Sequence, residues 1–262
     1  MNILTTDGLV KKYKNHVVVD NVNMHVEQGD IYGFVGENGA GKTTVIRIIT
    51  GLARPTEGTY SLYGMDYKDK QISTQRRKTS AIVEAVSLSG GMTALENLRI
   101  QCLLSDVNKT DEELIDLINL VGLDYESIKD KKVKNFSLGM RQRIGIALVM
   151  ASDPDFIILD EPLNGLDPQG FIDVRETILK LAKEKGVTFL ISSHVLAELD
   201  KICNKVGFIS HGKLLKEISI DELHDRARER VEIVLKDKDT IDDFSNYLVF
   251  SDKELINIIL SN

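Results

Sequence analysis

The residues best suited to chemistry are the nine from Gly36 to Thr44, which read GENGAGKTT and follow the apolar run Ile31–Val35. They fit the pattern G-x-x-x-x-G-K-[ST] of phosphate-binding loops. Glycines let successive backbone N–H groups curl around phosphate oxygens, Lys42 would place its charge on the β- and γ-phosphates, and the Thr43 hydroxyl would bind Mg²⁺. The predicted nucleotide contacts are Gly36, Glu37, Asn38, Gly39, Ala40, Gly41, Lys42, Thr43 and Thr44.

The alternative for this segment is a glycine-rich turn that binds nothing. Val35 ends an apolar run typical of a buried strand, and the segment after the loop has an apolar helical face that ends at Gly51. A helix that opens at Lys42 adds the partial positive charge of its N-terminus. The order of strand, loop and helix therefore favours a nucleotide site.

A pair of carboxylates follows a second apolar run, where Phe156–Leu159 leads into Asp160 and Glu161. A carboxylate at the end of a buried strand, beside a phosphate loop, is suited to hold Mg²⁺. The neighbouring carboxylate could polarise an attacking water. The alternative is a strand end that turns polar on reaching solvent, and the presence of the phosphate loop favours the functional interpretation.

Three further motifs are FSLGMRQR (Phe136–Arg143), NGLDP (Asn164–Pro168) and ISSH (Ile191–His194). Together with GENGAGKTT and FIILDEP, and in this order, they resemble the motifs of ATP-binding-cassette (ABC) ATPases over residues 1–220. The resemblance implies an α/β fold with a P-loop ABC-type nucleotide-binding domain. That domain would comprise an N-terminal antiparallel β-subdomain, a RecA-like core and an inserted helical signature subdomain, followed by a small C-terminal α/β appendage.

The resemblance assigns roles to single residues. Tyr13 matches the aromatic that stacks on adenine, with a surface tyrosine in a basic turn as the alternative. Asp160 matches the carboxylate that reaches Mg²⁺, Glu161 the general base, and His194 the histidine that contacts the γ-phosphate. Asp167 matches the aspartate that links two sites across a dimer. The implied cofactors are ATP and Mg²⁺.

The signature motif can also be read from its residue types. Ser137 is a good N-cap for the helix that follows, and we expect Gly139 to expose backbone at the helix start, which would make an anion-binding end. In the family this end binds the γ-phosphate held by a second protomer. Leu138 and Met140 depart from the usual LSGGQ and indicate a subfamily variant. The candidate contacts are Ser137, Gly139 and Met140.

Glu84 stands where the family usually has a glutamine that senses Mg²⁺ and the attacking water. A carboxylate there would add charge next to the metal and alter Mg²⁺ affinity or coupling; the alternative is a neutral subfamily substitution. The candidate metal residues are therefore Thr43, Glu84 and Asp160. Glutamate followed by SLSGGMTALENL resembles exporters that confer resistance or self-immunity to bacitracin or lantibiotics.

The resemblance thus implies an ATP-hydrolysing subunit that dimerises around two ATP–Mg²⁺ and powers an ABC transporter for a peptide antibiotic. Its partners would be transmembrane permease subunits and a second nucleotide-binding subunit, most simply an identical one. It would lie in the cytoplasm, on the inner face of the cell membrane. An alternative is a non-transport ABC ATPase that acts as an assembly scaffold.

Composition agrees with this class. The 262 residues are 42% hydrophobic and 28% charged, which suits a globular protein with a full core. The net charge of −7 argues against nucleic acid as a partner. No stretch is as long and apolar as a membrane span, and the N-terminus lacks an apolar signal core, so we expect a cytosolic protein. Cys102 and Cys203 have no metal-ligand spacing and are expected to be reduced and partly buried.

The elements that position these residues follow from the patterning. Residues 94–134 are expected to be helical, with a capping box from Thr110 to Glu113. Apolar or alternating runs predict strands, and the last two form a hairpin: Ile3–Val10, Val17–Val26, Thr59–Tyr63, Val187–Ile191, Val206–Ile209 and Lys213–Leu215.

The expected division of the chain is an ATPase domain at residues 1–220, with its helical subdomain at about 90–150, and an accessory element at 221–262. Within that accessory element we expect a charged helix at Asp221–Arg230, a strand at Val231–Leu235 and a last helix capped by Ser251 and Glu254.

Overall fold

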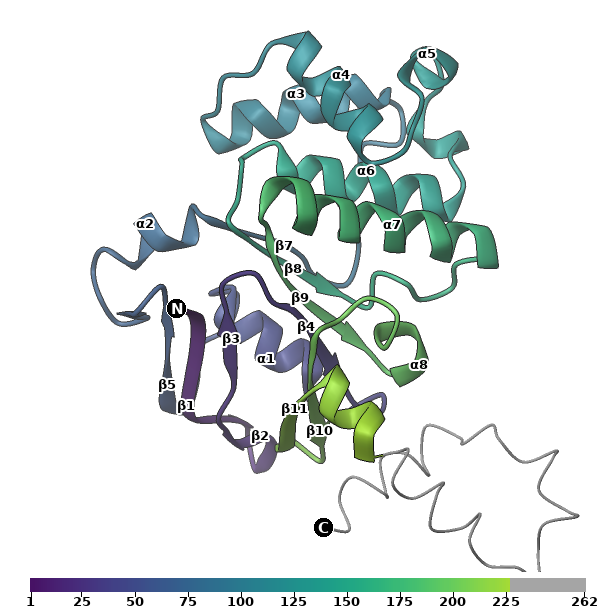
Figure 1. Ribbon diagram of the computed structural model, residues 1–262. Helices are drawn as coiled ribbons and strands as arrows, with labels where there is room; N and C mark the ends of the chain where they lie inside the picture. Colours follow the sequence, from purple (N-terminus) through teal and green to yellow (C-terminus); the bar gives the residue numbers. More distant parts are fainter. Residues whose placement is uncertain (227–262) are drawn as a thin grey trace, which may run out of the picture.

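The computed structural model describes residues 1–226 of the chain (Figure 1). Residues 220–226 are helical, which agrees with the start of the charged helix expected from Asp221. The rest of that helix, the strand expected at Val231–Leu235 and the helix expected after Ser251 lie outside the described residues. Of the proposed division into domains, only the part before residue 227 can therefore be described.

An antiparallel sheet occupies the N-terminal part of the chain, with strands in the order β2-β1-β5-β6 and β3 paired to β1. The run expected as one strand at Val17–Val26 is interrupted before Met24. There the Thr6 hydroxyl donates to Val22 O at 2.9 Å and accepts from Met24 N at 2.8 Å. The Thr6 hydroxyl thus bonds the backbone at the gap between the two strands that form. The strands of this sheet are β1 Asn2–Tyr13, β2 His16–Val22, β3 His25–Glu27, β5 Glu57–Leu62 and β6 Met65–Asp66.

A six-stranded sheet forms the centre of the molecule, in the order β11-β10-β4-β9-β8-β7. All its neighbours pair in parallel except β10 and β11, which form the expected hairpin. Every residue of β4, β8 and β9 is buried, as expected for strands covered on both faces. Its strands are β4 Ile31–Val35, β7 Thr79–Ile82, β8 Phe156–Asp160, β9 Thr188–Ser193, β10 Lys205–Ser210 and β11 Lys213–Ser219.

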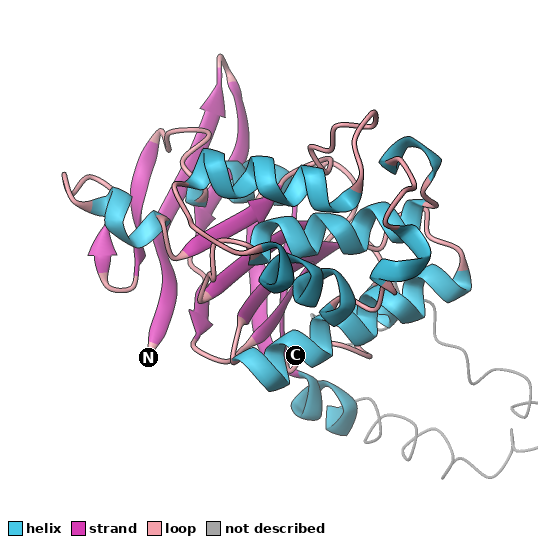
Figure 2. Cartoon of the chain, turned by 90° about the horizontal axis from the view of Figure 1, so that it is seen from above, coloured by secondary structure: helices cyan, strands magenta, loops and turns pink. Residues whose placement is uncertain are grey.

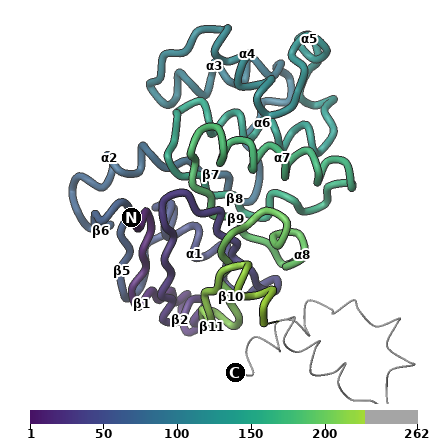
Figure 3. The backbone as a smooth tube through the Cα atoms, in the orientation of Figure 1, coloured from purple at the N-terminus to yellow at the C-terminus, as the bar shows by residue number. Residues whose placement is uncertain are grey.

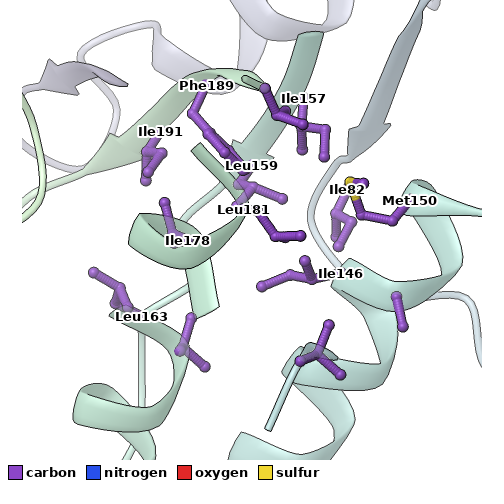
Figure 4. Packing of buried hydrophobic residues seen from close by; sticks show 14 of the residues in the cluster. Ile82, Ile146, Met150, Ile157, Leu159, Leu163, Ile178, Leu181, Phe189 and Ile191 are labelled. Carbon is purple, nitrogen blue, oxygen red and sulfur yellow. The ribbon is translucent and has the colours of Figure 1, made fainter. Parts of the chain in front are cut away.

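Alternate residues of the central strands belong to two different hydrophobic cores, one on each face of the sheet. Ile157 and Leu159 of β8 belong to the core shared with α6 (Leu138–Met150) and α7 (Pro168–Lys185), and Leu159 lies beside Leu181 of α7 in Figure 4. Phe156 and Ile158 belong to the core shared with α1 and the antiparallel sheet. Since burying each such side chain contributes roughly 1.5–3 kcal/mol, this alternation fixes the register of the strands that carry the site.

Helix α1 (Lys42–Ile49) lies between the two sheets, and α7 (Pro168–Lys185) crosses the opposite face of the parallel sheet (Figure 1). Figure 2 shows the longer helices gathered together beside the strands. Two further helices are short: α2 (Ile72–Arg76) and α8 (Leu196–Leu199). Within residues 1–226, no helix has both the length and the apolar character needed to cross a bilayer.

The helical segment expected from residue 94 leaves the sheet after β7 and returns to it at β8 (Figure 3). The capping box at Thr110 and Glu113 is confirmed, and Thr93 with Glu96 forms a second one. Cys102 and Cys203 are both free and buried. The helices of this segment are α3 Ala94–Ser105, α4 Asp111–Leu120, α5 Tyr125–Ile128, the 3₁₀ turn η1 Val133–Asn135 and α6 Leu138–Met150.

Candidate functional site

The phosphate-binding loop connects β4 to α1 at the carboxyl edge of the parallel sheet. Gly39 and Gly41 have φ of 84° and 108°, which is the left-handed region that favours glycine. A Cβ on Gly36 would lie 2.3 Å from the carbonyl oxygen of Ile209 in β10, so only glycine fits there. Glu37, Asn38 and Gly39 are exposed, whereas Ala40 and Gly41 are buried and Thr43 and Thr44 are partly buried. The loop therefore has the shape that its sequence predicts.

Lys42 lies in the centre of the loop with only 5% of its side chain exposed. Its Nζ donates to Gly36 O at 2.5 Å and to Glu37 O at 3.2 Å, and it lies 3.1 Å from Glu161 Oε1. A buried ammonium group needs several acceptors, because desolvation of an unpaired charge is costly. Phosphate oxygens are acceptors of the same kind, so this position suits an anion.

Asp160, the last residue of β8, is fixed by hydroxyl groups on both oxygens. Thr43 Oγ1 donates to its Oδ2 at 2.9 Å, and Ser192 Oγ at the end of β9 donates to its Oδ1 at 2.6 Å. Asp160 is buried, with 6% of the residue exposed. The carboxylate of Asp160 therefore does not lie at the surface. This favours the functional interpretation over a strand end that merely turns polar on reaching solvent.

Thr43 and Asp160 bring two hard oxygen ligands together beside the phosphate loop. Mg²⁺ in nucleotide sites is held by one or two protein carboxylates together with phosphate oxygens and water. A hydroxyl and a carboxylate 2.9 Å apart at the start of α1 fit that requirement. The donor set thus suits Mg²⁺ bound together with a nucleotide.

Glu161 and His194 lie on the neighbouring strand ends of β8 and β9. His194 Nδ1 lies 2.9 Å from Glu161 Oε2, while Glu161 Oε1 faces Lys42. Glu161 has φ of 50°, a left-handed conformation that is uncommon for a residue with a side chain. Its backbone turns sharply after the strand, and its carboxylate thereby comes next to the loop lysine. The motifs led us to expect these residues around the same phosphates, and parallel strand pairing brings them together.

The signature residues have local structural roles within the chain. Ser137 caps α6 and accepts a hydrogen bond from Met140 N at 3.2 Å. The expectation that Gly139 exposes its backbone is wrong, because Gly139 is buried and a Cβ there would lie 3.1 Å from Gly170 Cα of α7. Glycine at this position allows two helices to approach closely.

Asp167 caps the helix α7. Its Oδ1 accepts from Gly170 N at 3.0 Å, and Pro168 follows at the first helical position, a favourable sequence for a helix start. The carboxylate therefore has a structural task in addition to the role expected across a dimer.

Tyr13 and Glu84 each contact a basic side chain. Tyr13 is exposed at the end of β1, with the Lys11 ammonium 5.0 Å from its ring centroid. Glu84 follows β7 with φ of 66° and forms an ion pair with Arg47 of α1. The partner that the structure gives to Glu84 is thus an arginine on the phosphate-loop helix, and its expected role at the metal stays a prediction.

Ser192 lies within the ISSH motif but was given no role from the sequence, and Arg47 lies outside every quoted motif. Ser192 is fully buried and contacts Asp160. In the sequence it directly follows Ile191, the last residue of a predicted parallel strand. A polar residue at the carboxyl end of a buried strand next to a phosphate loop is the signal that could have identified it. For Arg47, the helical spacing from Lys42 carries no such signal.

Comparison with protein families places the chain among known sequences. A family model described as ABC transporter matches residues 19–164. The bacitracin transport ATP-binding protein of Bacillus licheniformis is 43% identical over 236 residues, which cover 90% of this chain and 76% of that protein. The lantibiotic transport ATP-binding protein of Streptococcus pyogenes is 37% identical over 219 residues, covering 84% of this chain and 92% of that protein.

Solved structures agree on the fold. An ATP-binding cassette of an ABC transporter in its ADP conformation superposes with a TM-score of 0.75 at 25% identity, covering 90% of this chain and 99% of that one. A dimeric cassette in a post-hydrolysis state with ADP and Pi gives a TM-score of 0.72 at 23% identity. That match covers 83% of this chain and 98% of the solved one. The fold expected from the sequence motifs is confirmed.

Proposed function

Since this chain belongs to the ABC transporter family of ATP-binding proteins, we propose that it drives export of, or immunity to, a peptide antibiotic of the bacitracin or lantibiotic type. The chain is the ATPase subunit of an ABC transporter. The observation that carries the catalytic part is the single cluster of Lys42, Thr43, Asp160, Glu161 and His194 at the carboxyl edge of one sheet.

The loop and Lys42 would bind the phosphates of ATP. Backbone N–H groups of the loop and the α1 N-terminus offer partial positive charge, and Lys42 offers a full charge in a buried position. Charge-assisted hydrogen bonds of this kind are about twice as strong as neutral ones. The nucleotide phosphates would then compete with Glu161 for Lys42, because both are anions within reach of one ammonium group.

Glu161 would act as the general base. Its carboxylate accepts the proton of an attacking water, and His194 Nδ1, at 2.9 Å, holds the carboxylate in orientation. His194 would also contact the γ-phosphate through its other ring nitrogen. Most of the rate enhancement in phosphoryl transfer comes from positioning and from stabilisation of charge, which these fixed groups supply.

Mg²⁺ would be held by the Thr43 hydroxyl and the Asp160 carboxylate, and it would neutralise charge that develops on the phosphates. Glu84 is proposed as a third residue that senses the metal. Its present partner Arg47 belongs to the same helix as Thr43, so a movement of this helix changes the surroundings of both.

A second protomer would complete the site. Ser137, Gly139 and Met140 lie at the N-terminus of α6, and the helix end offers the partial charge that a γ-phosphate needs. Asp167 lies at the N-terminus of α7, which packs against α6 through Gly139 and Gly170. We propose that these two helix ends face the phosphate loop of the partner, and that an identical chain is the simplest partner.

The permease would dock at a groove of about 560 Å³ beside Glu84. Ile82, Val83 and the residues Ala85–Ser87 line one side, and Leu52 after α1 lines another. Leu52 is 68% exposed although it is apolar, which favours a protein partner. Since Glu84 lies in the chain between the lining residues Val83 and Ala85, permease movement would reach the ATP site through it. We propose a cytoplasmic location on the inner face of the membrane for this reason.

The choice of a peptide antibiotic is supported by the names of the two relatives and by the glutamate at position 84. Deletion of the gene should lower the inhibitory concentration of bacitracin or of a lantibiotic, without changing that of an unrelated antibiotic that enters the cytoplasm. Complementation with the wild-type gene should restore resistance, and complementation with Lys42→Ala should not. Unchanged susceptibility to every peptide tested would contradict the proposed substrate class but not the ATPase function.

A further inference from the structure

One buried hydroxyl contacts both acidic residues of the site. Ser192 is 0% exposed at the end of β9. Its Oγ donates to Asp160 Oδ1 at 2.6 Å and accepts from the backbone N–H of Glu161 at 2.8 Å. Ser192 is also paired in register with Asp160 across the β8–β9 ladder. The contact is therefore set by the sheet and does not depend on a mobile loop.

The chemistry of a serine hydroxyl makes this bridge directional. A hydroxyl has a single proton to donate and two lone pairs to accept with. The proton goes to the ionised oxygen of Asp160, and the N–H of Glu161 points at a lone pair. Through these two hydrogen bonds the Ser192 hydroxyl links the carboxylate of Asp160, the proposed Mg²⁺ ligand, to the backbone of Glu161, the proposed base.

Both contacts constrain groups that would otherwise be free to move. The other oxygen of Asp160 is held by Thr43, so the hydroxyl of Ser192 fixes the rotation of the carboxylate plane. Glu161 has φ of 50°, a left-handed conformation that is strained for a residue with a side chain. A hydrogen bond to its N–H helps to hold that turn, which directs the carboxylate toward Lys42 and His194.

We infer that Ser192 is a positioning residue for ATP hydrolysis, which orients Asp160 for Mg²⁺ and Glu161 for the attacking water through one hydroxyl. The inference rests on the ATPase function. Residues that hydrogen-bond a metal ligand commonly contribute 10–100-fold to metal affinity or activity.

The neighbouring serine offers a matched comparison. Ser193 is 1% exposed, and its Oγ donates to Glu198 Oε2 at 3.0 Å and accepts from Val195 N at 3.0 Å. This hydroxyl stabilises the turn before α8 and does not touch Asp160 in the described part of the chain. Ser193→Ala and Ser192→Ala therefore each remove one buried hydroxyl from adjacent positions, but only the second touches the acidic pair.

The test measures binding of a fluorescent ATP analogue to the full chain, with Mg²⁺ and with EDTA, in a Glu161→Gln background that slows turnover. For Ser192→Ala we expect the gain in affinity due to Mg²⁺ to fall about tenfold, with affinity in EDTA unchanged. For Ser193→Ala we expect the Mg²⁺-dependent gain to stay as in the parent. In the protein that keeps its native Glu161, Ser192→Ala should also lower kcat about tenfold and raise the Mg²⁺ concentration that gives half the maximal rate.

Ser192→Cys controls for an empty cavity, because its somewhat larger thiol fills the place of the hydroxyl and is only a weak donor. It should melt close to the parent and still show the reduced Mg²⁺ dependence. If Ser192→Ala and Ser192→Cys bound Mg²⁺ and nucleotide as the parent does, the inference would be wrong even if their melting temperatures fell. Absence of hydrolysis by the wild-type chain would instead contradict the ATPase function, and this inference with it.

Discussion

Lys42 Nζ and Glu161 Oε1 lie 3.1 Å apart, so the buried lysine of the phosphate loop and the partly buried proposed base form one ion pair. The two residues are separated by the whole helical segment in the sequence and meet because β4 and β8 flank β9 in one parallel sheet. The pair neutralises two charges that burial would otherwise penalise. It also means that a nucleotide phosphate must compete with a carboxylate for Lys42.

Glu161→Gln should bind ATP severalfold more tightly than the wild type and hydrolyse it about 10²–10⁴-fold more slowly. Binding tightens because the variant removes the anion that competes for Lys42, and hydrolysis slows because an amide cannot take the proton of water. Equilibrium titration and a phosphate-release assay would measure both, and gel filtration with ATP should show a stable dimer. Glu176→Gln, at an exposed carboxylate on α7, is the matched control and should leave both values unchanged.

Lys42→Ala should weaken ATP binding by at least about tenfold, since a hydrogen bond to a charged group contributes about 1.5–3 kcal/mol. Calorimetric titration with a slowly hydrolysed ATP analogue would measure the dissociation constant. Lys129→Ala removes a lysine that is half exposed and paired with Glu126, and it should bind as the wild type does. An unchanged affinity in Lys42→Ala would overturn the assignment of the phosphate loop.

Gly36→Ala should destabilise the fold by about 1–3 kcal/mol, because the new methyl would press on the carbonyl oxygen of Ile209 at 2.3 Å. Denaturant unfolding gives the free energy of unfolding directly. Gly91→Ala is the control, since nothing lies within 4 Å of a Cβ there, and its effect should stay within about 0.5 kcal/mol. Equal free energies for the two variants would show that the loop can yield at Gly36.

Arg47→Ala should change the Mg²⁺ concentration for half-maximal hydrolysis only while Glu84 is present. The arginine neutralises that carboxylate, so its removal should have no further effect in an Arg47→Ala, Glu84→Gln double variant, which should behave like Glu84→Gln alone. Additive effects of the two changes would contradict a functional pair. The free energy of unfolding should show a coupling of about 1 kcal/mol or less, because both side chains are largely exposed.

Leu52→Ser should leave the stability of the chain within about 0.5 kcal/mol of wild type, because the side chain is already 68% exposed. It should nevertheless reduce co-purification with the permease from membranes. Leu215→Ser changes another exposed leucine, which lies on β11 and is not among the residues that line the groove, and it should co-purify normally. Equal recovery of both variants would show that the permease does not bind at Leu52.

Most of the fold could be predicted because its motifs are local. The strand before Gly36, the helix that opens at Lys42 and the capping box at Thr110 all depend on neighbours within a few residues. Where the structure departs from expectation, a distant contact is responsible. Thr6 interrupts a strand by binding Val22 and Met24, and Gly139 is buried by α7, a helix that was not assigned from the sequence.

The sequence by itself identified the groups that we propose for ATP chemistry: the loop around Lys42, the carboxylates Asp160 and Glu161, and His194. Only the tertiary structure decided which of these side chains form ion pairs or hydrogen bonds with one another. The ion pair of Lys42 with Glu161 and the bridge from Ser192 join residues far apart in the chain. The physical reason is that parallel pairing aligns the carboxyl ends of β4, β8 and β9, and burial of alternate side chains on both faces fixes their register.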